Sequence, residues 1–136
     1  MKRIILATTI AASTLAGTAS AEQYVCQTQQ STGFAYEGNG EWDSAPYAPS
    51  NTFLVDTDRL VRSQFGDPNR TETPCEEPYE YQGNNYYACP SMTGISGFMF
   101  NETMLRFTFS SHYGYAIPDI NGTPVLDIGT CVKLGG

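Results

Sequence analysis

The stretch from Gly97 to Leu134 constrains the fold most, because hydrophobic runs of strand length alternate there with turn residues. In order it contains GFMF, a polar break at Asn101-Glu102, TMLRFTFS, SHYGYAIP, a break at Asn121-Gly122 and PVLDIGTCVKL. Runs of this length, separated by polar and glycine-containing breaks, are typical of antiparallel strands joined by hairpins. The stretch therefore predicts three or four strands of a β-meander.

Pairing in the second half of the meander depends on Asn121-Gly122, because both residues tolerate the positive φ of a type I′ turn. This turn predicts that the two flanking strands share an apolar, buried face. The same register places Cys131 on the face opposite Leu126 and Ile128. A bulge at Gly129 would turn the cysteine inward. The expected opposed residues are Thr123 with Ile120, Leu126 with Ile117, Ile128 with Tyr115, and Thr130 with Tyr113.

Alternation in the first hairpin predicts a second set of core side chains. Large apolar residues there alternate with smaller or more polar ones, which is the period of a strand with one buried side. A turn at Asn101-Glu102 would place Phe98 opposite Leu105 and Phe100 opposite Thr103. The side chains expected inside are Phe98, Phe100, Leu105, Phe107 and Phe109.

The first 21 residues have the layout of a secretory signal peptide. Lys2 and Arg3 precede a modest apolar run, and Ala19-Ser20-Ala21 forms a small-residue cleavage site. The run is too short, and too rich in Thr, Ser and Ala, for a membrane span. We therefore expect residues 1–21 to be removed. Residues 22–136 should then form one disulfide-bonded domain without a transmembrane segment, in a bacterial periplasm or secreted.

The charge of the chain narrows the class of partner. The full sequence has seven basic and 14 acidic side chains, and a net charge of −7. Without Lys2 and Arg3, five basic side chains remain against 14 acidic ones, a net charge of −9. Nucleic acid is excluded as a partner, since phosphate binding requires a basic surface. An anionic surface favours a cationic partner, although it also serves solubility.

Four cysteines in an exported chain predict two disulfides, for which three connectivities are possible. We favour Cys75 with Cys89, which closes a local loop, and Cys26 with Cys131, which ties the first strand to the last. A zinc site is poorly supported. No two cysteines have the short spacing of a zinc half-site, and a single histidine cannot complete a mixed set.

The rest of the chain also predicts short strands and turns. A first strand is expected at 23–29, with Tyr24, Cys26 and Thr28 on one face, and a hairpin turn at 38–40. Strands are also expected at 53–55 and 60–65, although the second of these could be a short helix. With no long amphipathic helix and no repeat, the fold class is all-β: a single small antiparallel barrel or sandwich with two disulfides.

The assembled pattern resembles a known group of chains. It runs from YVCQT through GF with a nearby GEW, a strand ending in QFG, a cysteine pair, FMFN followed by LRF, a GY, and TPVLDIGTC. This is similar to a group of small exported four-cysteine bacterial β-domains without a known activity. The resemblance spans most of residues 22–136 and implies one disulfide-bonded β-domain. It implies no catalytic residue, cofactor or substrate.

Residues that could carry catalysis do not form a recognisable motif. His112, the sole histidine, would need a nearby serine and a carboxylate such as Asp119 or Asp127, but neighbours on a strand point to opposite faces. The acidic pairs Glu76-Glu77, Glu37 with Glu41, and Asp56 with Asp58 are best explained as solvated charges.

The spacing in 119–127 does not match a calcium loop. We expect no metal or cofactor, and we expect Trp42 to cap the core.

The stretch CEEPYEYQGNNYYAC, residues 75–89, is the best candidate for a binding loop. Tyrosines beside Asn and Gly are typical of adaptable recognition surfaces, because tyrosine offers a large contact area at small entropic cost. The alternative is a hairpin whose tyrosines pair across strands and pack on the core. The candidate binding residues are Tyr79, Tyr81, Asn84, Tyr86 and Tyr87.

These observations favour a non-catalytic exported domain that binds a protein or another ligand, with a cationic protein or a glycan as the partner classes. Small exported β-barrel lysozyme inhibitors are similar in size, charge and terminal cysteines. That similarity implies a second possible function, inhibition of a cationic cell-wall hydrolase, although only Ile95-Ser96-Gly97 resembles their serine-glycine loop. The sequence is also compatible with a small hydrolase and with a structural component of the envelope.

Overall fold

The computed structural model describes residues 22–91, 93–116 and 122–135, and all regular structure among them is β-strand. The predicted signal peptide, residues 1–21, lies outside the described residues. No helix that could span a membrane occurs in the described ranges. The strands are β1 Gln23–Gly38, β2 Glu41–Tyr47, β3 Thr52–Asp56, β4 Val61–Gln64, β5 Glu72–Pro74, β6 Tyr79–Tyr81, β7 Asn84–Ala88, β8 Ser96–Asn101, β9 Arg106–Ser111 and β10 Val125–Lys133.

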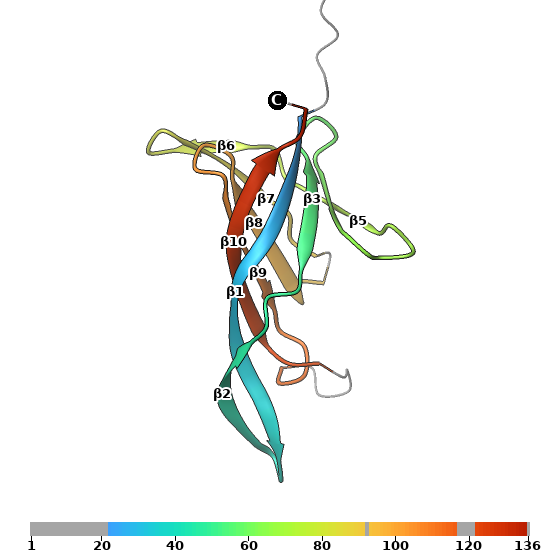
Figure 1. Cartoon of the computed structure of the whole chain (residues 1–136), viewed down its shortest axis with the longest axis vertical. Coiled ribbons are helices and arrows are strands. Elements are labelled where there is room, and N and C mark those ends of the chain that lie inside the picture. The colour runs from blue at the N-terminus through green and yellow to red at the C-terminus, as the bar shows by residue number, and fades with distance from the viewer. Residues whose placement is uncertain (1–21, 92, 117–121, 136) are drawn as a thin grey trace, which may run out of the picture.

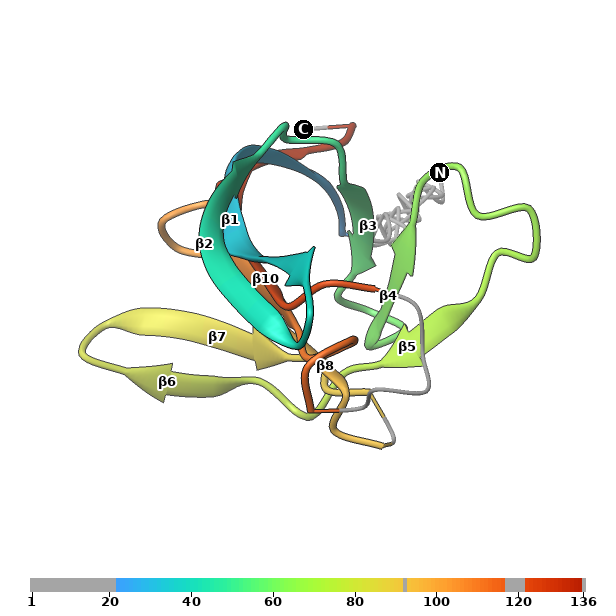
Figure 2. The ribbon, with the colours of Figure 1, turned by 90° about the horizontal axis from the view of Figure 1, so that it is seen from below.

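The strands form one antiparallel sheet in the order β5-β4-β3-β1-β10-β9-β8-β7-β6, and β2 pairs with β1 outside this path. The sheet is curled into a half-barrel, with β3 and β4 facing the β8 side (Figure 2). Two hairpins extend away from its body: β1–β2 at one end, and β6–β7 to the side (Figure 1). The all-β prediction is confirmed.

The core is built from aromatic rings on the inner face of the curled sheet. Phe53 of β3 is fully buried, and its ring centroid lies 5.2 Å from that of Phe98, 5.6 Å from that of Phe107 and 5.0 Å from that of Phe109. Tilted and edge-to-face contacts of this kind are favourable for aromatic pairs. The predicted inward side of the β8–β9 hairpin is confirmed for these rings, whereas Leu105 lies in the turn and is 36% exposed.

Both predicted disulfides are present. Cys26 of β1 lies directly opposite Cys131 of β10 in the strand register, so this bond joins the first strand to the last. The Cys75–Cys89 bond joins the residue after β5 to the residue after β7, and brings the two sides of the curled sheet together. Next to it, the Glu76 amide donates a hydrogen bond to the Ala88 carbonyl, with an N···O distance of 2.8 Å.

The predicted register of the last strand is wrong. β10 pairs with β9, so Leu126 opposes Ser110, Ile128 opposes Thr108 and Thr130 opposes Arg106, rather than residues of 113–117. The expected partners Ile117 and Ile120, and Asn121 of the expected turn, lie outside the described residues.

The predicted inward face of β10 is also wrong. Leu126 is 46% exposed and Ile128 is 42% exposed, whereas Asp127 between them is 1% exposed. Asn51 Nδ2 donates a hydrogen bond of 2.7 Å to Asp127 Oδ2, which satisfies the buried carboxylate. Because Asp127, Gly129 and Cys131 all point inward by simple alternation, β10 needs no bulge to bury its cysteine.

The bulge occurs instead on β1, between Thr28 and Gln30, opposite Gly129. Before the bulge the even-numbered residues Tyr24, Cys26 and Thr28 are buried, as predicted. After it the even-numbered residues face outward, since the extra residue reverses the alternation. Because of the bulge, the even-numbered side chains, which are buried in the first half of β1, face solvent in its second half.

Replacing Gly129 by alanine should lower the free energy of unfolding by about 1–3 kcal/mol. An added Cβ would collide with the Gln27 carbonyl oxygen and would lie 2.6 Å from Phe107 Cε1, at the point where β1 bulges. Urea unfolding followed by circular dichroism measures the change. Gly97→Ala is the control, because its Cβ would only reach ordinary contact with Ser110 Oγ at 3.5 Å. Equal losses in the two variants would contradict this account of the bulge.

Other local predictions have mixed outcomes. The hairpin turn at 38–40 and the strands at 53–55 and 60–65 are confirmed by β1–β2, β3 and β4. The turn between β8 and β9 is longer than predicted: Asn101 pairs with Arg106, and therefore Phe98 opposes Phe109. Trp42 does not cap the core. Its ring packs between Tyr36 and Tyr115, outside the core cluster.

Alkaline pH should destabilise the fold through Tyr24. This side chain is 3% exposed, and its hydroxyl donates a hydrogen bond of 2.8 Å to Glu102 Oε1. Burial, followed by the Glu102 carboxylate, raises the pKa of Tyr24 well above its usual value of 10.0. Because the pKa of Tyr24 is higher in the folded state than in the unfolded state, the protonated hydroxyl stabilises the fold fully at any pH well below the unfolded-state pKa. This stabilisation is lost progressively as the pH rises above about 10.

Urea unfolding at about pH 8 and at about pH 11 measures this effect. The free energy of unfolding of the natural protein should be lower at the higher pH. Tyr24→Phe should cost about 1 kcal/mol at the lower pH and show a smaller pH dependence. Some dependence should remain, because burial also raises the pKa of Tyr87. An unchanged pH dependence in Tyr24→Phe would contradict the assignment.

Candidate ligand groove

The outer face of the sheet carries two rows of side chains that cross several strands. In the first row, Gln30 of β1 opposes Ile128, which opposes Thr108 of β9, and Thr108 opposes Met99 of β8. Because side chains alternate between faces, these residues point away from the aromatic core. The second row consists of Thr130, Arg106, Asn101, Tyr86 and Tyr79.

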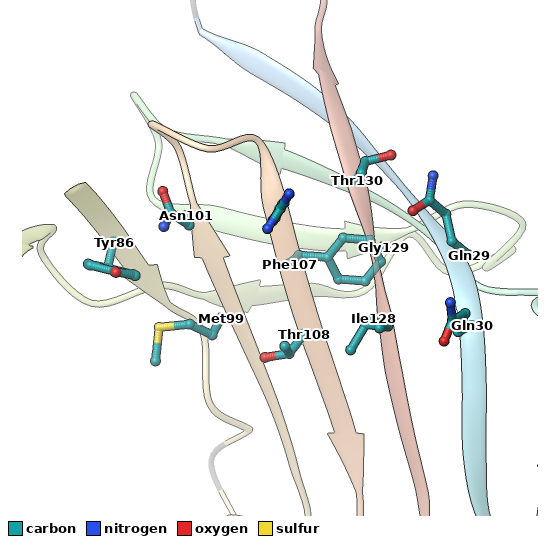
Figure 3. Close-up of a pocket in the computed structure, with 11 residues that line it drawn as sticks. Gln29, Gln30, Tyr86, Met99, Asn101, Phe107, Thr108, Ile128, Gly129 and Thr130 are labelled. Atoms are coloured by element: carbon teal, nitrogen blue, oxygen red, sulfur yellow. The ribbon is translucent and has the colours of Figure 1, made fainter.

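Two adjoining depressions, each of about 470 Å³, lie on this face. They share Gln29, Gln30 and Ile128, and we call them together the outer groove. Figure 3 shows the first depression, with Met99, Thr108 and Ile128 across its floor and Tyr86 at one side. The remaining lining residues are Asn101, Arg106, Phe107, Gly129 and Thr130 in the first depression, and Ser31, Thr32, Pro46, Tyr47, Pro49 and Leu126 in the second.

Tyr86, which lines one side of the outer groove, belongs to a stacked pair of tyrosines. Tyr79 and Tyr86 are opposed in the β6–β7 register, and their rings stack with centroids 5.3 Å apart and an interplanar angle of 19°. The Tyr79 hydroxyl donates a weak hydrogen bond to Met99 Sδ at 3.7 Å. These contacts hold the Tyr86 ring in place before any ligand arrives, which lowers the entropic cost of binding.

The hairpin divides the sequence-predicted binding residues between two faces. Tyr79, Tyr81, Asn84 and Tyr86 share the outer face, and Tyr81 is 59% exposed. Tyr87 points the other way, is 7% exposed, and packs on Phe100 with centroids 6.0 Å apart. Tyr87 is therefore not available to a ligand on the outer face, because strand alternation places it in the core. A binding role for the other residues stays a prediction, and among them only Tyr86 lines the outer groove.

The electrostatic character of the outer groove differs from that of the whole chain. The chain has 14 acidic residues, yet no Asp or Glu lines either depression. Arg106, which is exposed, is the one charged side chain among the lining residues. The other polar groups are amides and hydroxyls, which both donate and accept hydrogen bonds. The lining is therefore suited to an uncharged or anionic ligand with many hydroxyl groups.

The residues considered for catalysis do not converge. The His112 side chain is exposed, and Asp127, its proposed acid, is buried in its hydrogen bond with Asn51. Asp119 lies outside the described residues. Within the described ranges, the His112 ring forms no hydrogen bond with a serine or carboxylate, so this arrangement does not support a triad. No group of three or more His, Cys, Asp or Glu side chains suited to a metal ion occurs there either.

Comparison of the chain with models of protein families, with curated proteins and with solved structures found no match. The outer groove is therefore interpreted from its own residues. Sequence reasoning found its tyrosine wall but missed its floor on β8, β9 and β10. The available signal was Cys131: its inward direction forces Ile128 and Leu126 outward by alternation along β10.

Proposed function

We propose that this chain is an exported, non-catalytic binding domain that holds a glycan in the outer groove. The observation that carries this proposal is a carboxylate-free groove in an acidic protein, with Tyr86 held by its stack with Tyr79 at one side and amide and hydroxyl groups along it. A sugar ring has apolar C–H faces that can pack on an aromatic ring. Its hydroxyl groups can exchange hydrogen bonds with side chains such as Gln30, Asn101 and Thr108.

Several features support export. Residues 1–21 have the signal-peptide pattern, and two disulfides stabilise the described domain. Disulfides form and persist in oxidising compartments, such as the bacterial periplasm and the extracellular space. An exported domain meets cell-surface and cell-wall glycans, which are the class of ligand that the groove chemistry favours.

Calorimetric titration of the protein recovered after export tests the proposal. The probes are a tetrasaccharide of β-1,4-linked N-acetylglucosamine and a tetrasaccharide of α-1,4-linked glucose. At least one should bind with a dissociation constant of about 1 mM or tighter. Tyr86→Ala should weaken this binding by about tenfold or more, because it removes the ring that lines the groove.

Tyr81→Ala is the matched control for this titration. Tyr81 is a tyrosine of the same hairpin, is 59% exposed, and does not line the outer groove. Its replacement should change affinity by less than about twofold. Circular dichroism spectra of both variants should match the natural protein. Binding of neither sugar, or equal loss in the two variants, would refute the groove as a glycan site.

A further inference from the structure

The β1–β2 hairpin ends in an arm that pairs with no other strand in the part of the chain that the structure describes. β1 pairs with β10 only as far as Gly33, and beyond it pairs with β2 alone. Residues 34–45 are here called the arm; its tip projects beyond the rest of the domain (Figure 1), and at its base the Phe34 amide donates a hydrogen bond of 3.1 Å to the Pro124 carbonyl. The arm begins after the β1 bulge, and it does not line the outer groove.

One face of the arm is aromatic and open to solvent. Phe34 is 50% exposed and Tyr36 is 56% exposed. The Tyr36 ring packs on Trp42 at 5.3 Å, and Trp42 packs edge-on against Tyr115 at 5.7 Å. The Gly40 amide donates a hydrogen bond of 3.0 Å to the Tyr36 hydroxyl. These contacts order the Tyr36 and Trp42 rings, as expected of a preorganised recognition surface.

Charge decides which partner this surface fits. The arm carries Glu37, Glu41 and Asp43, all exposed, and contains no lysine or arginine. Alternation along β2 places Glu41 and Asp43 on the face opposite Trp42, so the arm has an aromatic face and a carboxylate-bearing reverse face. A second copy of this acidic chain would be repelled, because like charges would meet. A basic surface is complementary to it.

We propose that the arm inserts into the cleft of a cationic protein, with Phe34 and Tyr36 packing on an apolar wall of the cleft and the carboxylates pairing with basic residues of the opposite wall. Large rings that are preorganised yet exposed supply most of the energy in protein interfaces of this kind. Carboxylates at the rim chiefly increase the association rate and the dependence on salt. This surface is separate from the outer groove, so the two proposals can fail independently.

Surface plasmon resonance of the protein recovered after export tests the docking, with lysozyme as the probe because it is a basic protein with an open cleft. Binding in about 50 mM salt should have a micromolar dissociation constant and should weaken in about 300 mM salt. Phe34→Ala should weaken binding about tenfold at both salt concentrations. The double variant Glu41→Gln/Asp43→Asn should weaken it about fivefold at low salt and reduce the salt dependence.

The double variant Glu76→Gln/Glu77→Gln removes the same charge from exposed positions outside the arm and is the matched control. It should change affinity by less than about twofold. An equal loss in this control would show general attraction between opposite charges and would overturn the docking assignment. Absence of binding at about 100 μM protein, or self-association of the chain that Phe34→Ala abolishes, would also overturn it.

Discussion

Replacing Cys26 and Cys131 together by alanine is expected to lower the free energy of unfolding by about 5 kcal/mol. The two residues are separated by 105 positions, and they join the central strands β1 and β10. In the chain-entropy account, a cross-link stabilises by restricting the unfolded chain, and a longer loop is restricted more. Because small domains are stable by only about 5–15 kcal/mol, this variant should be largely unfolded at moderate temperature.

The Cys75→Ala/Cys89→Ala variant provides the comparison. Its cysteines are separated by 14 positions, so its loss should be about 3 kcal/mol. Urea unfolding of both variants and the natural protein, followed by circular dichroism, measures the difference. Equal losses, or a larger loss from the short loop, would contradict the assignment of Cys26–Cys131 as the main cross-link.

Phe53→Ala is expected to lower the free energy of unfolding by about 3–5 kcal/mol. Phe53 is fully buried, and its ring contacts those of Phe98, Phe107 and Phe109. The Arg62 guanidinium also lies over it, 5.3 Å from the ring centroid. Truncation would therefore leave a cavity where opposite sides of the half-barrel meet, and would remove one of the rings that accommodate a buried cation.

Phe65→Ala is the matched control, because Phe65 is the same residue type and is 55% exposed. Its loss should be less than about 1 kcal/mol. The measurement is the urea midpoint at constant slope, which separates a change in stability from a change in the exposed surface. A loss below about 1 kcal/mol in Phe53→Ala would show that the aromatic cluster is not the core.

The fold class, both disulfides and most of the core could be predicted from the sequence, and the reasons are physical. Strand alternation and turn residues are local properties, so they can be read along one segment. The pairing of Cys26 with Cys131 followed from the idea that the first and last strands meet, and they do. Pairing partners are not local. The Asn121-Gly122 signal indicated a hairpin, but β10 pairs with β9.

The core also depends on competition among side chains for a limited volume. Leu126 and Ile128 are typical core residues, yet the aromatic rings of β3, β8 and β9 already fill the interior. Asp127 is tolerated inside because Asn51, 76 positions away in the sequence, supplies a hydrogen bond. Neither fact has a signature in the residues around β10.

The candidate site shows the same division. The tyrosine-rich hairpin was recognisable from its composition between two cysteines. The floor of the outer groove was not, because its side chains come from β8, β9 and β10, whose pairing is not local, and it meets β1 beside the β1 bulge. Bulges commonly redirect side chains next to functional sites. Here the bulge also turns Phe34 and Tyr36 outward on the arm.

Mapping of amide chemical shifts by NMR, during titration with the two tetrasaccharides, tests the central claim most directly. The account predicts that the largest changes fall on outer-groove residues such as Tyr86, Thr108 and Ile128, with little change at Glu76 and Glu77. Changes confined to other surfaces, or none at about 5 mM sugar, would contradict the assignment of the outer groove as a glycan site.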